Sequence, residues 1–190
     1  AMVQWLGKNV CVVGLGRSGK AAINLLLQRA ANIVAFDDVD ASLPKSEILS
    51  YEQRGVIFFN KISEEFPDGN LDLVVVSPGV AFDHPLVKKL DARGIPIWSE
   101  LELGWRETRC SSIAITGTNG KTTTTEWISE MLSKNGRQTI AAGNIGLPLC
   151  EVADRTQDLD VVTLEVSSFQ LEGVDGFKPN VALILNLAED

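Results

Sequence analysis

The sequence is poor in the residues that build metal sites and disulfide frameworks. Among its 190 residues there is one histidine, His84, and there are three cysteines, Cys11, Cys110 and Cys150, which stand far apart and form no CxxC pair. Such scattered ligands do not predict a zinc site, and an odd number of isolated cysteines does not predict disulfides. We therefore expect reduced thiols and a cytoplasmic location.

Long apolar segments and dense positive charge are also missing from the sequence. No apolar run reaches the roughly 18 residues that cross a membrane, and we expect no signal peptide. Lysine and arginine number 17 against 25 aspartates and glutamates, which gives a net charge of −8. Because nucleic-acid binders usually present a basic face, we expect neither nucleic acid nor a membrane as partner. With 45% hydrophobic residues, the chain has a globular composition.

Short apolar segments rich in β-branched residues alternate with helical patterns through the first half of the chain. Strands are expected over residues 9–16, 32–38, 56–59, 71–79 and 95–99, and helices over residues 18–29, 47–54, 86–93 and 100–107. This order is typical of an α/β fold with a doubly wound parallel sheet. We predict a Rossmann-like N-terminal domain over residues 1–108.

The alternating pattern restarts in the second half. Strands are expected over residues 112–117, 138–143, 160–168 and 181–186, and a helix over residues 122–135, with Ile128, Met131 and Leu132 on one face. A parallel strand normally needs a crossover helix to cover it, and none follows the last strand. We therefore predict that residues 109–190 form an incomplete P-loop-type parallel α/β central domain.

A glycine loop, GTNGKT, lies between the strand and the helix at the start of this second half. Glycines let backbone N–H groups approach phosphate oxygens, and a helix N-terminus adds partial positive charge. The loop is shorter than GxxxxGK[ST], because Ile115 stands where that motif has its first glycine. A glycine-rich helix entry with a surface lysine is the alternative. We expect ATP to be bound by Gly117, Thr118, Asn119, Gly120, Lys121, Thr122 and Thr123.

Two side chains of the second half are candidate magnesium ligands. The hydroxyl of Thr122 follows the loop lysine, where such a hydroxyl binds Mg²⁺. Glu165 ends the apolar strand DVVTLE, and a carboxylate at the carboxyl end of a parallel strand faces the ligand crevice. The alternative for Glu165 is a solvated or structural side chain.

The run GLGRSG, from Gly14 to Gly19, matches the pattern GxGxxG between a strand and a helix, and Asp37 follows about 20 residues later. This fingerprint first suggests that the loop binds NAD, but a nucleotide diphosphate sugar would use the same interactions. The glycines could also serve only for close packing of the helix on the strand, without any ligand. Ser77, Pro78 and Gly79 end another strand at the same sheet edge, where they would line the same crevice.

Taken in order, GTNGKT, GNIGLP, LEVSSFQLE and ILNLAED resemble the Mur ligases of peptidoglycan synthesis, and the first half with GLGRSG and SPG fits that family. The run EVSSFQLE resembles the member that adds D-glutamate in particular. The resemblance implies that the first domain binds the uridine diphosphate part of UDP-N-acetylmuramoyl-L-alanine and that the central domain binds ATP and Mg²⁺. It also implies that an acyl phosphate forms and that the amine of D-glutamate displaces phosphate from it.

Residue by residue, the resemblance implies catalytic roles for Lys121, Glu165 and Asn144, and magnesium binding by Thr122 and Glu165. The uridine diphosphate substrate would be bound by Arg17, Ser18, Asp37, Asp38, Ser77, Pro78, Gly79 and Asn144. Ser167 and Gln170 are further candidates, either for contacts with the substrate or for contacts with the residues that touch it.

The family pattern continues with a histidine after Asp190, a modified lysine and a C-terminal domain that binds the amino acid, none of which this sequence contains. We therefore expect a truncated, monomeric ligase that forms no amide bond on its own. Two alternatives remain open, an NAD-binding oxidoreductase or sensor and a non-catalytic UDP-sugar binding module.

Overall fold

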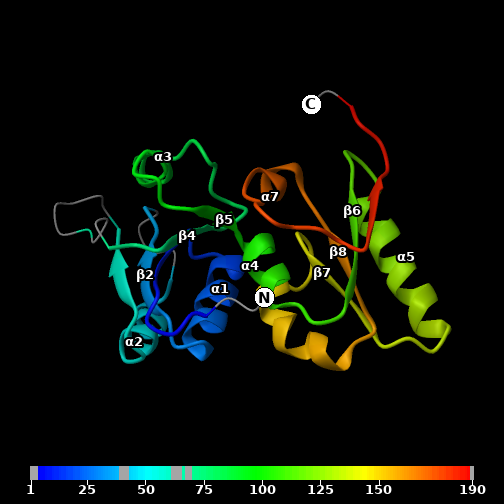
Figure 1. The fold of residues 1–190 in the computed structure, drawn as a ribbon, viewed down its shortest axis with the longest axis horizontal. Helices are drawn as coiled ribbons and strands as arrows, with labels where there is room; N and C mark the ends of the chain where they lie inside the picture. The colour runs from blue at the N-terminus through cyan, green and yellow to red at the C-terminus, as the bar shows by residue number, and fades with distance from the viewer. Residues whose placement is uncertain (1–3, 39–42, 61–65, 67–69, 189–190) are drawn as a thin grey trace.

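The computed structural model describes residues 4–38, 43–60, 66 and 70–188. Its elements form two parallel sheets that lie beside each other, with helix α4 between them (Figure 1). Within the described part of the chain, no helix is long and apolar enough to span a membrane. The expected α/β fold class is confirmed.

The first sheet has the strand order β3-β2-β1-β4-β5, and all of its pairs are parallel. This is the order of a doubly wound fold, as the sequence predicts. The strands are β1 (Asn9–Val13), β2 (Asn32–Phe36), β3 (Ile57–Phe59), β4 (Leu73–Val76) and β5 (Ile97–Ser99), and the helices are α1 (Arg17–Gln28), α2 (Lys45–Glu52), α3 (Pro85–Asp91) and α4 (Glu100–Glu107).

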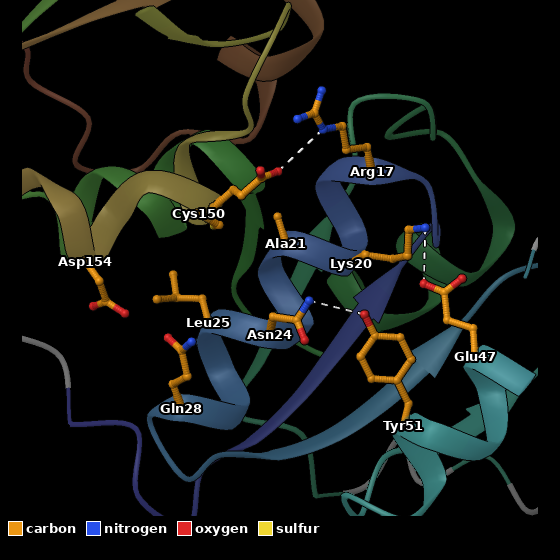
Figure 2. A pocket seen from close by; sticks show the side chains of 11 residues that line it. Arg17, Lys20, Ala21, Asn24, Leu25, Gln28, Glu47, Tyr51, Cys150 and Asp154 are labelled. Carbon is orange, nitrogen blue, oxygen red and sulfur yellow. Dashed lines mark hydrogen bonds and ion pairs between the residues drawn. The ribbon is translucent and has the colours of Figure 1, made fainter. Parts of the chain in front are cut away.

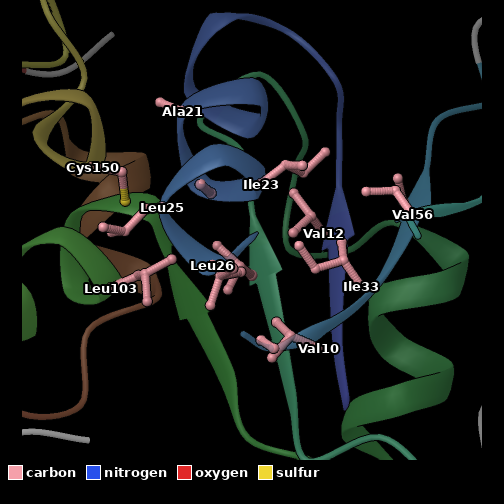
Figure 3. Packing of buried hydrophobic residues seen from close by; sticks show 14 of the residues in the cluster. Val10, Val12, Ala21, Ile23, Leu25, Leu26, Ile33, Val56, Leu103 and Cys150 are labelled. Carbon is pink, nitrogen blue, oxygen red and sulfur yellow. The ribbon is translucent and has the colours of Figure 1, made fainter. Parts of the chain in front are cut away.

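Both faces of the first sheet are buried, which explains its continuous apolar strands. Val10 and Val12 pack in one cluster with residues of α1, including Leu26, as Figure 3 shows. Cys11 and Val13 point to the opposite cluster, which includes residues of α3. Because all the strands run in the same direction, their carboxyl ends lie at one edge of the sheet, where the first glycine loop leads into α1.

The second sheet has the order β7-β8-β6-β9, also parallel throughout. Its elements are β6 (Ser111–Thr116), α5 (Lys121–Lys134), β7 (Thr139–Gly143), α6 (Leu149–Val152), a 3₁₀ helix (Ala153–Asp158), β8 (Val161–Glu165), α7 (Ser168–Glu172) and β9 (Val181–Ile184). The strands and α5 lie where the sequence predicts them. The three short helices were not predicted, because four to six residues are too few to show a helical period.

Helix α5 departs from the expected pattern of burial. Ile128 and Leu132 are half-buried, but Met131 is 61% exposed and Trp127 is 65% exposed. Thr125 is the residue of this helix that is fully buried. Of the three residues expected on one face of this helix, Ile128 and Leu132 are thus partly buried, whereas Met131 is exposed.

Helix α4 links the two sheets through buried carboxylates. Glu100 accepts a hydrogen bond of 2.6 Å from the backbone N–H of Cys150, at the start of α6. Glu102 accepts backbone hydrogen bonds from Gly176 and Phe177, which precede β9. Both side chains are fully buried, so α4 fixes the second sheet against the first through interactions shielded from water.

Candidate functional site

The GTNGKT loop connects β6 to α5 as the sequence predicts. Gly120 is the residue before the helix and has a φ of +86°, a left-handed conformation that favours glycine. The chain can therefore turn sharply from the strand into the helix. The first N–H groups of α5 have no partner within the helix and are available to an anion at this end.

Lys121 is the first residue of α5, and its side chain folds back over the loop. The Nζ atom donates hydrogen bonds to the carbonyl oxygens of Gly117 at 2.7 Å and Thr118 at 3.2 Å. An ammonium group has three N–H donors, so one is left for a ligand. The lysine charge is therefore held against the carbonyl groups of the loop.

Three of the predicted residues, Glu165, Thr122 and Asn144, meet at the carboxyl end of β8. The Glu165 side chain is 2% exposed. Its Oε2 accepts a 2.7 Å hydrogen bond from the Thr122 hydroxyl, and its Oε1 accepts a 3.2 Å hydrogen bond from the amide of Asn144. Oxygen atoms from a hydroxyl, a carboxylate and an amide are thus gathered beside the glycine loop. The described residues form no group of three or more His, Cys, Asp or Glu that could hold a metal.

Asn186 is a site residue that the sequence analysis missed. It follows β9, and its Oδ1 accepts a 2.9 Å hydrogen bond from the backbone N–H of Asn119, while its Nδ2 donates to the Asn119 carbonyl at 3.0 Å. Its carbonyl also accepts from the N–H of Thr118. The asparagine therefore braces the glycine loop, and its place in the run ILN was the only signal that could have suggested this.

A cavity of about 670 Å³ lies at the carboxyl edge of the first sheet. It is lined by residues 14–17, 37, 38, 77, 79–81 and 83–85. Five of the predicted uridine diphosphate residues therefore share one cavity: Arg17, Asp37, Asp38, Ser77 and Gly79. Ser18 and Pro78 do not line it, and Asn144 lies at the second sheet against Glu165.

The first glycine loop is packed tightly against its own strand. A Cβ atom at Gly19 would lie 1.8 Å from the carbonyl oxygen of Gly14, so only glycine allows α1 to approach β1 this closely. Asp37 holds the same loop, because its Oδ2 accepts a 2.8 Å hydrogen bond from the N–H of Leu15. Asp37 is thus at least partly a structural residue.

Arg17 lines the first-sheet cavity and also a second hollow. Figure 2 shows it at the end of this second hollow, which runs along α1 and is also lined by α2 and α6. Its Nε atom is 3.4 Å from the Glu151 carboxylate, and both side chains are exposed. An exposed ion pair of this kind is weak, so the guanidinium can turn toward a ligand in the first cavity at little energetic cost.

Two sequence profiles match this chain. Residues 8–99 match the profile described as Mur ligase MurD-like, N-terminal domain, and residues 115–190 match the Mur ligase middle domain.

The chain belongs to the Mur ligase family.

Curated relatives within the family are UDP-N-acetylmuramoylalanine--D-glutamate ligases. The relative from Alkaliphilus metalliredigens is 42% identical over 186 residues, which is 96% of this chain and 41% of the relative. The relative from Thermoanaerobacter sp. (strain X514) is 39% identical over 185 residues, or 97% of this chain and 40% of the relative. The chain thus spans about 40% of the length of these Mur ligases.

Solved structures of Mur ligase relatives share the fold. A murein peptide ligase from Psychrobacter arcticus has a TM-score of 0.57 at 20% identity and is matched over 97% of this chain and 44% of its own. The UDP-N-acetylmuramate:L-alanyl-gamma-D-glutamyl-meso-diaminopimelate ligase from Neisseria meningitides has a TM-score of 0.53 at 16% identity, over 97% of this chain and 62% of its own. These likenesses support the two-sheet architecture.

The SSFQLE run of this Mur ligase chain forms the short helix α7. Ser167 caps the helix, since its hydroxyl accepts from the N–H of Gln170 at 3.2 Å, and the Gln170 side chain accepts from the N–H of Ser167. Gln170 is 1% exposed, and its Nε2 has no hydrogen-bond partner among the described residues. The two residues thus fix the turn that follows Glu165.

Proposed function

We propose that this chain supplies the uridine-diphosphate-binding and ATP-binding parts of a ligase that adds D-glutamate to UDP-N-acetylmuramoyl-L-alanine in peptidoglycan synthesis. The chemistry would activate the substrate carboxylate as an acyl phosphate, which the amine of D-glutamate then attacks. Phosphoryl transfer of this kind depends mainly on positioning and on neutralising charge. The names of the curated relatives support the choice of substrates.

The observation that carries the proposal is the contact of Glu165 with Thr122 and Asn144 beside the glycine loop. Lys121 and the backbone N–H groups of residues 117–123 would hold the ATP phosphates. Asn144 would contact the substrate near its reacting carboxylate. These residues come from the loop after β6, the start of α5, the end of β8 and the segment after β7, so the sheet edge would bring a phosphate cradle and a substrate residue together.

Thr122 and Glu165 have the donor chemistry that magnesium requires. Mg²⁺ prefers oxygen ligands, keeps several waters and is usually held by one or two carboxylates together with substrate phosphates. A hydroxyl and a carboxylate that already lie within 2.7 Å of each other fit that pattern. When bound, the ion would neutralise negative charge on the phosphoryl group.

Titration calorimetry with a non-hydrolysable ATP analogue, with and without magnesium chloride, tests the ATP site. The Lys121→Ala variant should bind the analogue roughly tenfold to 100-fold more weakly, because a charged hydrogen bond to phosphate is lost. The Glu165→Gln variant should lose the gain in affinity that magnesium gives. The matched control is Glu172→Gln, since Glu172 is exposed on α7. A Glu165 variant that keeps the full magnesium effect would refute the metal site.

Thermal shift separates the proposed ligase from an NAD-binding protein. We expect UDP and UDP-N-acetylmuramoyl-L-alanine to raise the melting temperature of the chain, and NAD to leave it unchanged. Stabilisation by NAD alone would overturn the proposed use of the cavity in the first sheet.

We also propose a domain boundary near residue 108, between α4 and β6, and a monomeric, cytoplasmic protein. The break in the pattern before β6 (Ser111–Thr116) supports the boundary. Three free cysteines support a reducing compartment. Sedimentation velocity would test the monomer, and a concentration-dependent dimer would contradict it.

A further inference from the structure

His84 stands at the rim of the first-sheet cavity, and both of its ring nitrogens are engaged. Its Nδ1 accepts a 3.2 Å hydrogen bond from the backbone N–H of Leu86, so the side chain caps helix α3. Its Nε2 lies 3.1 Å from Oδ2 of Asp38. Because Nδ1 is the acceptor, the neutral ring carries its proton on Nε2 and donates it to the aspartate.

The imidazole is held more firmly than the carboxylate it contacts. Its ring packs edge-on against Phe36 with 5.9 Å between the ring centres. The His84 side chain is 17% exposed, whereas that of Asp38 is 61% exposed. An exposed aspartate normally samples several rotamers, so a hydrogen bond from a fixed ring restricts the directions in which its oxygens point.

The two neighbouring carboxylates at the end of β2 therefore differ in role. Asp37 accepts from the backbone N–H of Leu15 and supports the first glycine loop. Asp38 makes its contact with the side chain of His84, and both residues line the cavity. In doubly wound folds, an acidic residue at the end of this strand accepts hydrogen bonds from the hydroxyl groups of a bound nucleotide.

We propose that His84 is a positioning residue that holds the Asp38 carboxylate as the hydrogen-bond acceptor for hydroxyl or N–H donors of the uridine part of the ligand. The inference rests on the proposed function, because it assumes that the cavity takes a uridine diphosphate. His84 acts through Asp38 and needs no contact with the ligand itself.

Two substitutions separate the two nitrogens of His84. In His84→Asn, the side-chain oxygen stands near the position of Nδ1 and keeps the helix cap, for which asparagine is well suited, but the side chain is too short to reach Asp38. In His84→Gln, the amide nitrogen can reach the position of Nε2 and donate to Asp38, while the cap is lost.

The test is calorimetric titration of UDP into the full 190-residue chain and these variants, with melting temperatures measured in parallel. We expect His84→Asn to bind UDP about three- to tenfold more weakly at an unchanged melting temperature. We expect His84→Gln to bind UDP like the unsubstituted chain but to melt about 2–4 °C lower, since a cap is lost.

A double-substitution cycle with Asp38→Asn shows whether His84 acts through Asp38. The Asp38→Asn chain should bind UDP more weakly, and adding His84→Asn to it should cause no further loss. If His84→Gln, the variant expected to melt lower, binds UDP more weakly than His84→Asn, then UDP affinity follows stability and the inference is overturned. Full UDP affinity in His84→Asn would overturn it too. Failure of the unsubstituted chain to bind UDP would overturn the proposed function as well.

Discussion

Replacing Glu100 with glutamine should stabilise the folded chain above neutral pH and leave its stability nearly unchanged in mild acid. The Glu100 side chain is fully buried; Oε1 accepts from the N–H of Cys150, while Oε2 has no hydrogen-bond partner among the described residues. Burial raises the pKa of Glu100 from 4.5 to about 7, against the opposing effect of hydrogen bonds from Cys150 and with a smaller contribution from the Glu151 charge.

The size of the effect follows from the two pKa values. Because the pKa in the folded state lies above that in the unfolded state, the folded chain keeps an extra proton between about pH 4.5 and 7. The free energy of unfolding therefore falls as the pH rises through this window, by about 3 kcal/mol in all. For a chain of this size, each kcal/mol moves the melting temperature by roughly 2–4 °C.

The assay compares melting temperatures of the unsubstituted chain and the Glu100→Gln variant from about pH 4 to about pH 8.5, beyond both ends of the window. The amide resembles the protonated carboxyl group, since each places an unpaired donor at the Oε2 position. The difference between the two chains should therefore be small in acid and grow to several degrees at the alkaline end, in favour of the variant.

Glu102→Gln is the matched control on the same helix. Glu102 is equally buried, but its oxygens accept from Arg106 and from backbone N–H groups that include those of Gly176 and Phe177. Replacing this carboxylate with an amide should lower the free energy of unfolding by about 1–3 kcal/mol at neutral pH, because the amide nitrogen cannot accept these hydrogen bonds. If Glu100→Gln is instead less stable at every pH, with a constant difference, the reasoning about burial is wrong.

Two further predictions concern packing and thiol reactivity. Gly19→Ala should lower the melting temperature by several degrees or prevent folding, because its Cβ would meet the Gly14 carbonyl oxygen at 1.8 Å. A Cβ at position 16 would meet no atom within 4 Å, so Gly16→Ala should melt normally. Equal melting temperatures of the two variants would contradict the close packing. Iodoacetamide should label Cys110 before Cys11, since Cys110 is half-buried while burial raises the pKa of Cys11 to about 12. Peptide mass spectrometry would measure this order, and earlier labelling of Cys11 would contradict it.

The sequence predicts well those features that have a local pattern. The runs GLGRSG and GTNGKT each predict a strand, a turn and a helix, and both sets of elements lie where expected. Glu165 could be placed at a sheet edge because it ends a buried apolar run. The exposure of Met131 could not be predicted, since helical spacing shows which residues share a face but not how much of that face is covered.

Contacts between residues that lie far apart in the sequence have no local pattern from which they could be predicted. His84 and Asp38 are 46 positions apart, and Asn186 is 67 positions from Asn119. The folded sheet order brings both pairs together, because β2 and β4 lie on either side of β1 and β9 lies beside β6. Arg17 lines the first cavity, where its motif predicts it, but its ion pair with Glu151 of α6 could not be predicted from the motif.

The brace that Asn186 provides has a consequence for the order in which the protein is made. The glycine loop at Thr118 and Asn119 is synthesised early, but the asparagine that holds it comes after β9 (Val181–Ile184). During translation from the N-terminus, the loop must therefore wait for a later strand before it takes its final shape. Under the proposed function, a nascent chain that ends before Asn186 should bind ATP more weakly than the 190-residue chain, because its glycine loop lacks this brace.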